Sequence, residues 1–155
     1  MLVSSCGYSL VGRGMALPPD IRTITIPVFK NSTGEPDIEN VVTRSVKDRF
    51  IQDGRLSVVD SAADSVLYGV VAGYGLRPLS YDDQNNVTAY LAELNISVTH
   101  KTTSGRVLSR RRVDTKEVYK VDASLAGSES QRNEALKRSA STAAESILSQ
   151  VVEAF

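Results

Sequence analysis

Residues 89–101 constrain the fold of this chain more than any other segment. From Tyr90 to Val98 every even position is apolar, and the odd positions are polar apart from Leu91. Side chains of a β-strand alternate between its two faces, so this segment has one apolar face and one polar face. A helix would scatter the same residues around its circumference, so the pattern predicts a strand. The apolar face of such a strand needs a covering layer.

Composition limits the classes of function that remain open. A chain of 155 residues is long enough for one domain with a sizeable core. Lysines and arginines number 18, as do aspartates and glutamates, so bulk charge does not draw the protein to nucleic acid or to an anionic membrane. Binding through charge must therefore come from local clusters. No apolar run is long enough for a membrane-spanning helix, so we expect none.

The only cysteine, Cys6, follows one apolar and two small residues, Val3, Ser4 and Ser5. This order is similar to the end of a bacterial lipobox, whose cysteine is acylated and becomes the mature N-terminus. A complete export signal also has a basic region and an apolar region, and neither precedes Cys6 here. Residues 1–20 are interpreted as a truncated signal remnant, a lipobox and a tether; a free thiol in a tail is the alternative. Acyl chains on Cys6 would hold the protein on a membrane without a spanning helix.

The first third of the domain predicts a strand, a helix and a second strand. Residues 21–29 alternate apolar and polar side chains, and Pro27 either ends this strand or confines it to an edge of the sheet. Asp37 is the predicted N-cap of a helix with an apolar stripe. Gly54 has the position of a C-terminal helix glycine, and residues 55–59 follow it as a short strand.

The middle of the chain predicts an antiparallel meander of long strands. Residues 66–79 form the first strand, the segment around Tyr90 is central, and residues 106–119 return after a turn at residues 102–105. The first strand carries glycines on one alternation face: Gly69, Gly73 and Gly75. Such glycines indicate either a coiled and bulged strand or a partner surface that lies flat against them.

The return strand has the strongest local charge. Its basic residues, together with the lysine before the turn, are Lys101, Arg106, Arg110, Arg111, Arg112 and Lys116. Alternation projects Arg110 and Arg112 to one face and Arg111 to the other. These side chains are either a solvated guard of a sheet edge or an anion site, because guanidinium groups bind phosphates through paired hydrogen bonds. The phosphate could belong to a glycolipid head group or a nucleic acid backbone. No aromatic residues are interleaved with the arginines, which argues against single-stranded nucleic acid.

The C-terminal part of the chain predicts a long helix. Ser128 and Gln131 have the spacing of a capping box, and apolar residues recur at spacings of three and four as far as Phe155. This helix would cover the apolar face of the sheet and leave its last turns for a partner. The predicted fold class is α+β: a two-layer sandwich with a mixed sheet of about four strands, a long antiparallel meander and two helices packed on one face. Residues 21–155 form this single domain.

The sequence contains no recognisable catalytic set. His100 is the only histidine and lies near the end of a strand, whereas Cys6 lies in a tail, so neither a metal cluster nor a nucleophilic arrangement can be assembled. Asp82, Asp83 and Asp114 could be considered as an acid–base pair, but nothing positions them. We therefore expect no enzyme, no metal and no cofactor other than an N-terminal lipid on Cys6.

A series of short motifs runs along nearly the whole chain. They occupy residues 6–8, 17–21, 24–33, 35–36, 41–50, 53–56, 79–82 and the strand around Tyr90. Their order resembles the lipopolysaccharide-assembly lipoprotein family, LptE; the specificity lies in the order rather than in any one motif. The fold of that family, a mixed sheet with two helices on one face and the second helix C-terminal, agrees with the fold predicted above.

The resemblance implies a function and a set of partners. It implies an outer-membrane lipoprotein that faces the periplasm, is lipidated at Cys6, and plugs the LptD β-barrel to help lipopolysaccharide reach the outer leaflet. The implied partners are LptD, lipopolysaccharide and the membrane through the lipid anchor, but not nucleic acid. Lipopolysaccharide contacts in the family are basic and lie around the sheet and its loops. In the loop before the Tyr90 strand, this chain instead has Asp82, Asp83, Asn85 and Asn86. The candidate lipopolysaccharide-binding residues are therefore Lys101, Arg106, Arg110, Arg111, Arg112 and Lys116.

The front half of the chain also resembles a second group of proteins. Residues 27–33, the helix after them and residues 54–59 are similar to the amino-terminal domain of TolB-like proteins and related periplasmic lipoproteins. That resemblance would imply an envelope adaptor with no lipopolysaccharide role. The long meander and the terminal helix favour LptE. A third class, an envelope hydrolase, is disfavoured because no catalytic set is present.

Overall fold

A computed structural model describes residues 18–152 and shows six strands and two helices. In chain order they are β1 (Thr23–Thr25), β2 (Lys30–Asn31), α1 (Ile38–Asp53), β3 (Ser57–Val58), β4 (Ser65–Tyr81), β5 (Val87–Thr102), β6 (Val107–Lys120) and α2 (Leu125–Val152). The strands form one mixed sheet in the order β3-β1-β4-β5-β6, and β2 also pairs with β4. The predicted α+β fold is confirmed. The sheet has six strands rather than about four. Two short strands, β1 and β2, form on either side of Pro27, and the two-residue β3 also joins the sheet.

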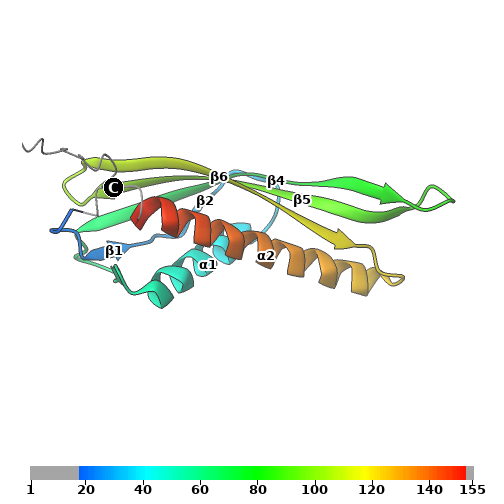
Figure 1. Cartoon of the computed structure of the whole chain (residues 1–155), viewed down its shortest axis with the longest axis horizontal. Coiled ribbons are helices and arrows are strands. Elements are labelled where there is room, and N and C mark those ends of the chain that lie inside the picture. Colours follow the sequence, from blue (N-terminus) through cyan, green and yellow to red (C-terminus); the bar gives the residue numbers. More distant parts are fainter. Residues whose placement is uncertain (1–17, 153–155) are drawn as a thin grey trace, which may run out of the picture.

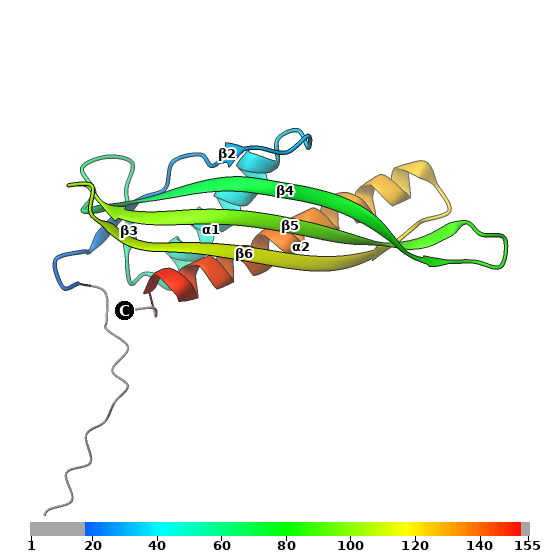
Figure 2. The ribbon, with the colours of Figure 1, turned by 90° about the horizontal axis from the view of Figure 1, so that it is seen from above.

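The two layers of the domain are the sheet and the pair of helices. Figure 1 shows α1 and α2 on the same face of the sheet, and Figure 2 shows the sheet lying over them. Fully buried side chains from both layers meet between them: Ile24, Val46, Leu94, Ile96 and Ile147. In both views the β4–β5 hairpin continues beyond the ends of β6 and α2. The other face of the sheet, which we term the outer face, is covered by neither of the two described helices.

β5 has the alternating faces that its sequence predicts. Leu94, Ile96 and Val98 are buried under the helices, whereas Ser97 on the opposite face is exposed. The alternation continues past Val98 to His100, which is completely buried. β5 pairs antiparallel with both β4 and β6, so the predicted meander with this strand at its centre is confirmed.

β4 is bulged, as one of the two interpretations of its glycines predicts. The register with β5 shifts between Val71 and Gly73, so that Ala72 has no partner residue. Gly69 lies on the buried face against the ring of Phe29, and a Cβ added to Gly69 would meet ring carbons at 2.3–2.4 Å. At Gly69, Phe29 of this chain therefore occupies the space that a partner surface was considered to fill, whereas the space beside Gly75 is open.

β1 ends where the sequence indicates, but it does not lie at an edge. It pairs parallel with β3 on one side and with β4 on the other. Its last residue is Thr25, so Pro27 lies outside the strand and no ladder hydrogen bond is lost. Of the two alternatives for Pro27, the structure selects termination.

Both ends of α1 lie at the predicted residues. Gly54 has φ 74° and donates its N–H to the Phe50 carbonyl, as a C-terminal helix glycine does. Asp37 is the N-cap residue, but its side chain caps no backbone N–H. Instead, its carboxylate accepts a hydrogen bond from the Asn40 amide at 2.7 Å. The position of the cap was predictable, whereas its chemistry differs from that of an ordinary Asp cap.

α2 begins three residues before the predicted start at Ser128. The Ser128 hydroxyl accepts a hydrogen bond from the Asp122 N–H and donates one to the Asp122 carbonyl, so it holds the connection from β6 rather than a capping box. The buried stripe begins at Ala135 and continues to Val152, while the first turns carry no buried side chain. Phe155 and Cys6 lie outside the described residues. No helix within residues 18–152 combines the length and apolar character needed to span a membrane.

Candidate functional site

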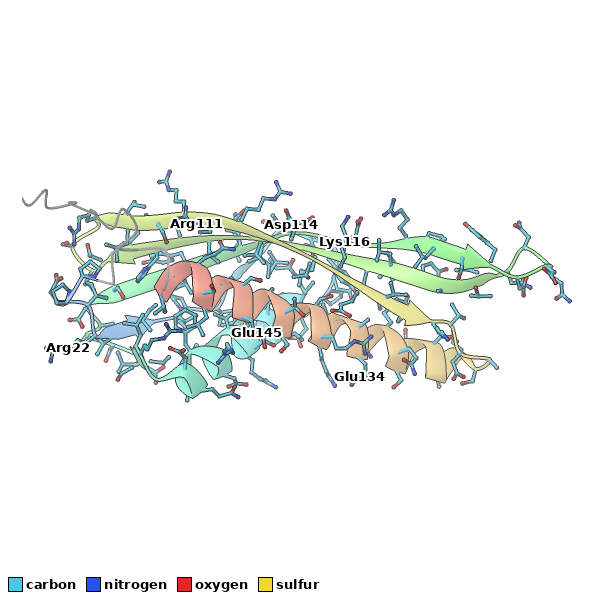
Figure 3. The ribbon with its side chains drawn as sticks, in the orientation of Figure 1. Arg22, Arg111, Asp114, Lys116, Glu134 and Glu145 are labelled. Atoms are coloured by element: carbon cyan, nitrogen blue, oxygen red, sulfur yellow. The ribbon has the colours of Figure 1, made fainter. Side chains whose placement is uncertain are left out.

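The outer face of the sheet brings together most of the basic residues selected from the sequence. Cross-strand pairing places Arg110 beside Thr99, Arg112 beside Ser97 and Lys116 beside Glu93. These β5 partners have odd numbers and lie opposite the buried even face. Figure 3 shows Asp114 and Lys116 on the sheet layer, and Glu134 and Glu145 on the helix layer.

The basic side chains form a row across three strands. We term this row the basic strip and define it as Arg77, Lys101, Arg110, Arg112 and Lys116. Lys101 projects its Nζ over the ring of Tyr68, 5.7 Å from the ring centroid. Arg77 and Lys116 both approach the Glu93 carboxylate, at 3.6 and 3.3 Å respectively. Two carboxylates, Glu93 and Asp114, lie within the strip, so basic groups predominate there.

Asp114 pairs with one cation of the basic strip, Arg112, and leaves Arg110 without an ion-pair partner in the part of the chain that the structure describes. Its carboxylate accepts a hydrogen bond from the Asn95 amide at 2.6 Å and one from Arg112 Nε at 3.1 Å. The Asn95 amide and then Arg112 hold the pKa of Asp114 below its usual range, so the carboxylate is ionised at neutral pH. Arg110 has no ion-pair partner among the described residues. Among the arginines of the basic strip, Arg110 is therefore the one most available to an incoming anion.

Two of the candidate residues lie apart from the basic strip. Arg106 precedes β6 in the turn, where its backbone N–H donates to the Thr102 hydroxyl at 3.0 Å. Arg111 pairs with Val98, whose side chain is buried on the helix side, so Arg111 belongs to the opposite alternation face from Arg110. It remains exposed because β6 is the last strand of the sheet. The predicted division of Arg110 and Arg112 from Arg111 is confirmed.

Arg77 belongs to the basic strip but was not among the candidate residues. Strict alternation along β4 would place Arg77 on the face opposite Tyr68. The bulge at Ala72 reverses the alternation, so Arg77 and Tyr68 both lie on the outer face. The glycines around the bulge were the only sequence signal that could have indicated this reversal.

The loop at the tip of the β4–β5 hairpin is held by its own carboxylate. Asp82 accepts hydrogen bonds from the N–H groups of Gln84 and Asn86 at 2.9 and 2.8 Å. The Asn86 bonds, followed by that of Gln84, lower the pKa of Asp82. Asn85 adopts φ 64° within this turn. The acidic and amide residues of the loop thus form a turn and add no cation to the basic strip.

The arrangement is suited to binding anions on an open surface. Guanidinium and ammonium groups on a rigid sheet can bind phosphate oxygens through charge-assisted hydrogen bonds. The exposed Tyr68 ring beside Lys101 adds an apolar surface at one end of the basic strip. Among residues 18–152, no group of three or more His, Cys, Asp or Glu side chains is arranged to hold a metal ion.

Solved structures with the same fold include several bacterial lipoproteins. Rare lipoprotein B from Shewanella oneidensis is 19% identical with a TM-score of 0.58, over 82% of this chain and 92% of that chain. Lipoprotein B from Nitrosomonas europaea is 18% identical with a TM-score of 0.60, over 94% and 90% of the two chains. PelC from Paraburkholderia phytofirmans, a dodecamer, is 14% identical with a TM-score of 0.61, over 91% and 92%. At these identities the similarity establishes the fold alone.

The fold defines a class of small α+β domains that includes these lipoproteins. Within this class, the sequence model of the LptE family, described as lipopolysaccharide-assembly, matches residues 21–151. The chain therefore belongs to the LptE family of lipopolysaccharide-assembly lipoproteins. The family resemblance identified from the sequence is confirmed, and the match favours it over the TolB-like alternative. The sequence matches none of the curated proteins with which it was compared.

Proposed function

We propose that this protein is an outer-membrane lipoprotein, anchored on the periplasmic side through a lipid on Cys6, that plugs the LptD β-barrel. In this position it assists the insertion of lipopolysaccharide into the outer leaflet and has no catalytic activity of its own. The observation that carries the proposal is the LptE family match over residues 21–151. A TolB-like adaptor would not require this match.

We assign the contact with lipopolysaccharide to the basic strip. Phosphate groups on a glycolipid are the anions that best suit guanidinium forks on an open sheet. Arg110 is expected to contribute most, because Arg112 already bonds to Asp114 and Lys116 already approaches Glu93. The rigid pairing of β5 with β6 holds these cations at fixed spacing, which favours a repeated phosphate pattern over a single free anion.

Co-purification tests the partner. A tagged full-length protein is recovered from the outer membrane of its native host, and the proteins that accompany it are identified. Recovery of LptD in roughly equal amount would support the plug proposal. Recovery of other envelope proteins without LptD would replace it with the adaptor function, even if the protein still bound lipopolysaccharide.

Charge reversal tests the basic strip. Arg110→Glu should weaken binding to purified lipopolysaccharide by about tenfold, since a charge-assisted hydrogen bond is lost and repulsion is introduced. Arg111→Glu is the matched control: it makes the same charge change on the same strand, but on the opposite alternation face. Equal affinity of the two variants, with cooperative unfolding intact, would remove the basic strip as the site. Dephosphorylated lipopolysaccharide should show no difference between them.

A further inference from the structure

The edge of β4 is paired only along its first half. β1 pairs with β4 at Ser65 and Val66, and β2 pairs with it at Val70 and Val71. The Ser32 N–H donates to the Val71 carbonyl at 3.0 Å, which is the last backbone bond on this edge within the described part of the chain. Figure 2 shows β4 along the margin of the sheet from there to the point where the hairpin twists near its tip. About half of a 17-residue strand is thus a free edge.

The pairing of β5 shows which backbone groups of this edge are free. The Val121 N–H donates to the Thr88 carbonyl, so the even residues of β5 direct their backbone groups toward β6. The odd residues Leu91 and Glu93 therefore direct theirs toward β4. Their partners there are Arg77 and Gly75, whose backbone groups are used within the sheet.

The residues between these partners present their backbone groups to the free edge. Tyr74 and Leu76 each offer an N–H and a C=O, and Pro78 offers only a C=O. An edge with such groups is a template on which an extended segment of another chain can add as a further strand. Pro78 marks the limit of the edge, because no donor is available at that position.

The side chains along the free edge differ between the two faces. On the helix side, Tyr74 and Leu76 are half-buried and apolar. On the outer face, Gly75 has no heavy atom within 4 Å of an added Cβ, and the Arg77 side chain is 65% exposed. An added strand would thus place one set of side chains beside apolar groups and the other set beside Arg77.

The opposite edge of the sheet is much less suited to strand addition. β6 carries Arg110, Arg111, Arg112, Asp114 and Lys116 along its length, and charges of this density are a common guard against edge pairing. The free edge of β4 has only Arg77 and Pro78 as guards. Within residues 18–152, one of the two long edges of the sheet is therefore open.

We propose that the free edge of β4, at Tyr74 and Leu76, binds an extended segment of a partner protein that alternates apolar and acidic side chains. The apolar side chains pack beside Leu76, and the acidic ones face Arg77 and the basic outer face. A second copy of this chain fits less well, because it would bring its own Arg77 and basic strip toward those of the first. This inference concerns a protein segment and stands independently of lipopolysaccharide binding.

Hydrogen exchange measured by NMR on the folded protein tests the proposal directly. The probe is a short synthetic peptide that alternates valine and glutamate. At saturating peptide, the Tyr74 and Leu76 amides should exchange at least about tenfold more slowly than in the free protein, because they become hydrogen-bonded. The Gly75 and Arg77 amides, already bonded to β5, should be unaffected, as should those of Arg112 and Asp114 on the β6 edge.

Matched probes separate backbone pairing from charge. A peptide with lysine in place of glutamate should bind about tenfold more weakly, and a peptide N-methylated at alternate residues should not bind. Leu76→Pro removes an outward N–H but leaves the bonds of Gly75 and Arg77 to β5, so it should weaken binding about tenfold with cooperative unfolding retained. Leu76→Val is its control.

Three outcomes would overturn the inference. Unchanged exchange at Tyr74 and Leu76 would show that the peptide does not add to this edge as a strand. Equal binding of the lysine peptide would refute the acidic partner. Slow exchange at these amides in the free protein, accompanied by dimerisation in sedimentation experiments, would identify a second copy as the occupant.

Discussion

Burial of His100 makes the stability of this domain depend on pH. The side chain is completely buried, and neither ring nitrogen has a hydrogen-bond partner among the described residues. Its cross-strand neighbours are Leu67 on β4 and Ser109 on β6, neither of which is charged. Burial alone lowers the pKa of His100 from 6.5 to about 4. In the folded protein the ring is therefore neutral over a pH range in which the unfolded chain is protonated.

The size of the effect follows from this difference in pKa. Between pH 6.5 and about 4 the unfolded state binds more protons than the folded state, so the free energy of unfolding falls as the pH falls. Each pH unit in this window removes about 1.4 kcal/mol, and about 3 kcal/mol is lost once the pH is below both pKa values. Such a loss is a large fraction of the stability of an ordinary domain.

Urea unfolding at a series of pH values measures this loss, with His100→Leu as the comparison. The variant has no group that titrates in this window at the same site, so the difference between the two proteins isolates the histidine. At neutral pH the variant should be at least as stable as the original, because two unbonded buried nitrogens are removed. His100 is the only histidine, so its NMR titration can be assigned without ambiguity. Parallel pH profiles for the two proteins, or a titration near the ordinary histidine pKa, would refute the reasoning.

Two further predictions concern packing and hydrogen bonding in the core. Gly69→Ala should destabilise the domain by about 1–3 kcal/mol in urea unfolding, because the new methyl group would overlap the buried Phe29 ring. Gly75→Ala, where the space is open, should change stability by less than about 0.5 kcal/mol; equal losses in the two variants would contradict the packing argument. Thr43→Val should cost about 1–3 kcal/mol, because the buried Phe29 N–H would lose its 2.9 Å bond to the Thr43 hydroxyl. Thr43→Ser retains that hydroxyl and should recover most of the loss; failure to do so would point to packing of the methyl group instead.

The parts of the fold that could be predicted are those specified by local pattern. The alternation around Tyr90 identifies the central strand, because one face of β5 is buried from Ala92 to Thr102. Gly54 identifies the end of α1, because a left-handed residue is needed there. The start of α2 was predicted too late, because Ser128 bonds to the backbone of Asp122 instead of capping a helix. Local spacing cannot distinguish these two uses of a serine hydroxyl.

The candidate site could be predicted where the alternation was regular. Arg110 and Arg112 lie on the outer face, and Arg111 on the other, as counting along an unbulged strand requires. Arg77 was missed because its face depends on a bulge, which is set by pairing with a distant segment. The burial of His100 was also missed, although the alternation that buries Ile96 and Val98 extends to it without interruption. His100 was not assigned to the core because its side chain is polar, although its position in the alternation predicts burial.

The bulge at Ala72 makes this point of β4 tolerant of a change in chain length. Val71 pairs with Ile96 and Gly73 with Asn95, so the partners on either side of the bulge are already adjacent on β5. Deletion of Ala72 would therefore remove the bulge and leave the pairing of the other β4 residues as it is. Tyr74 and Leu76 would remain on the helix side and Arg77 on the outer face. Loss of one residue at an unbulged position of β5 would instead turn the residues that follow to the opposite face. Sequence divergence in this sheet should therefore admit a one-residue deletion at the bulge more readily than within β5.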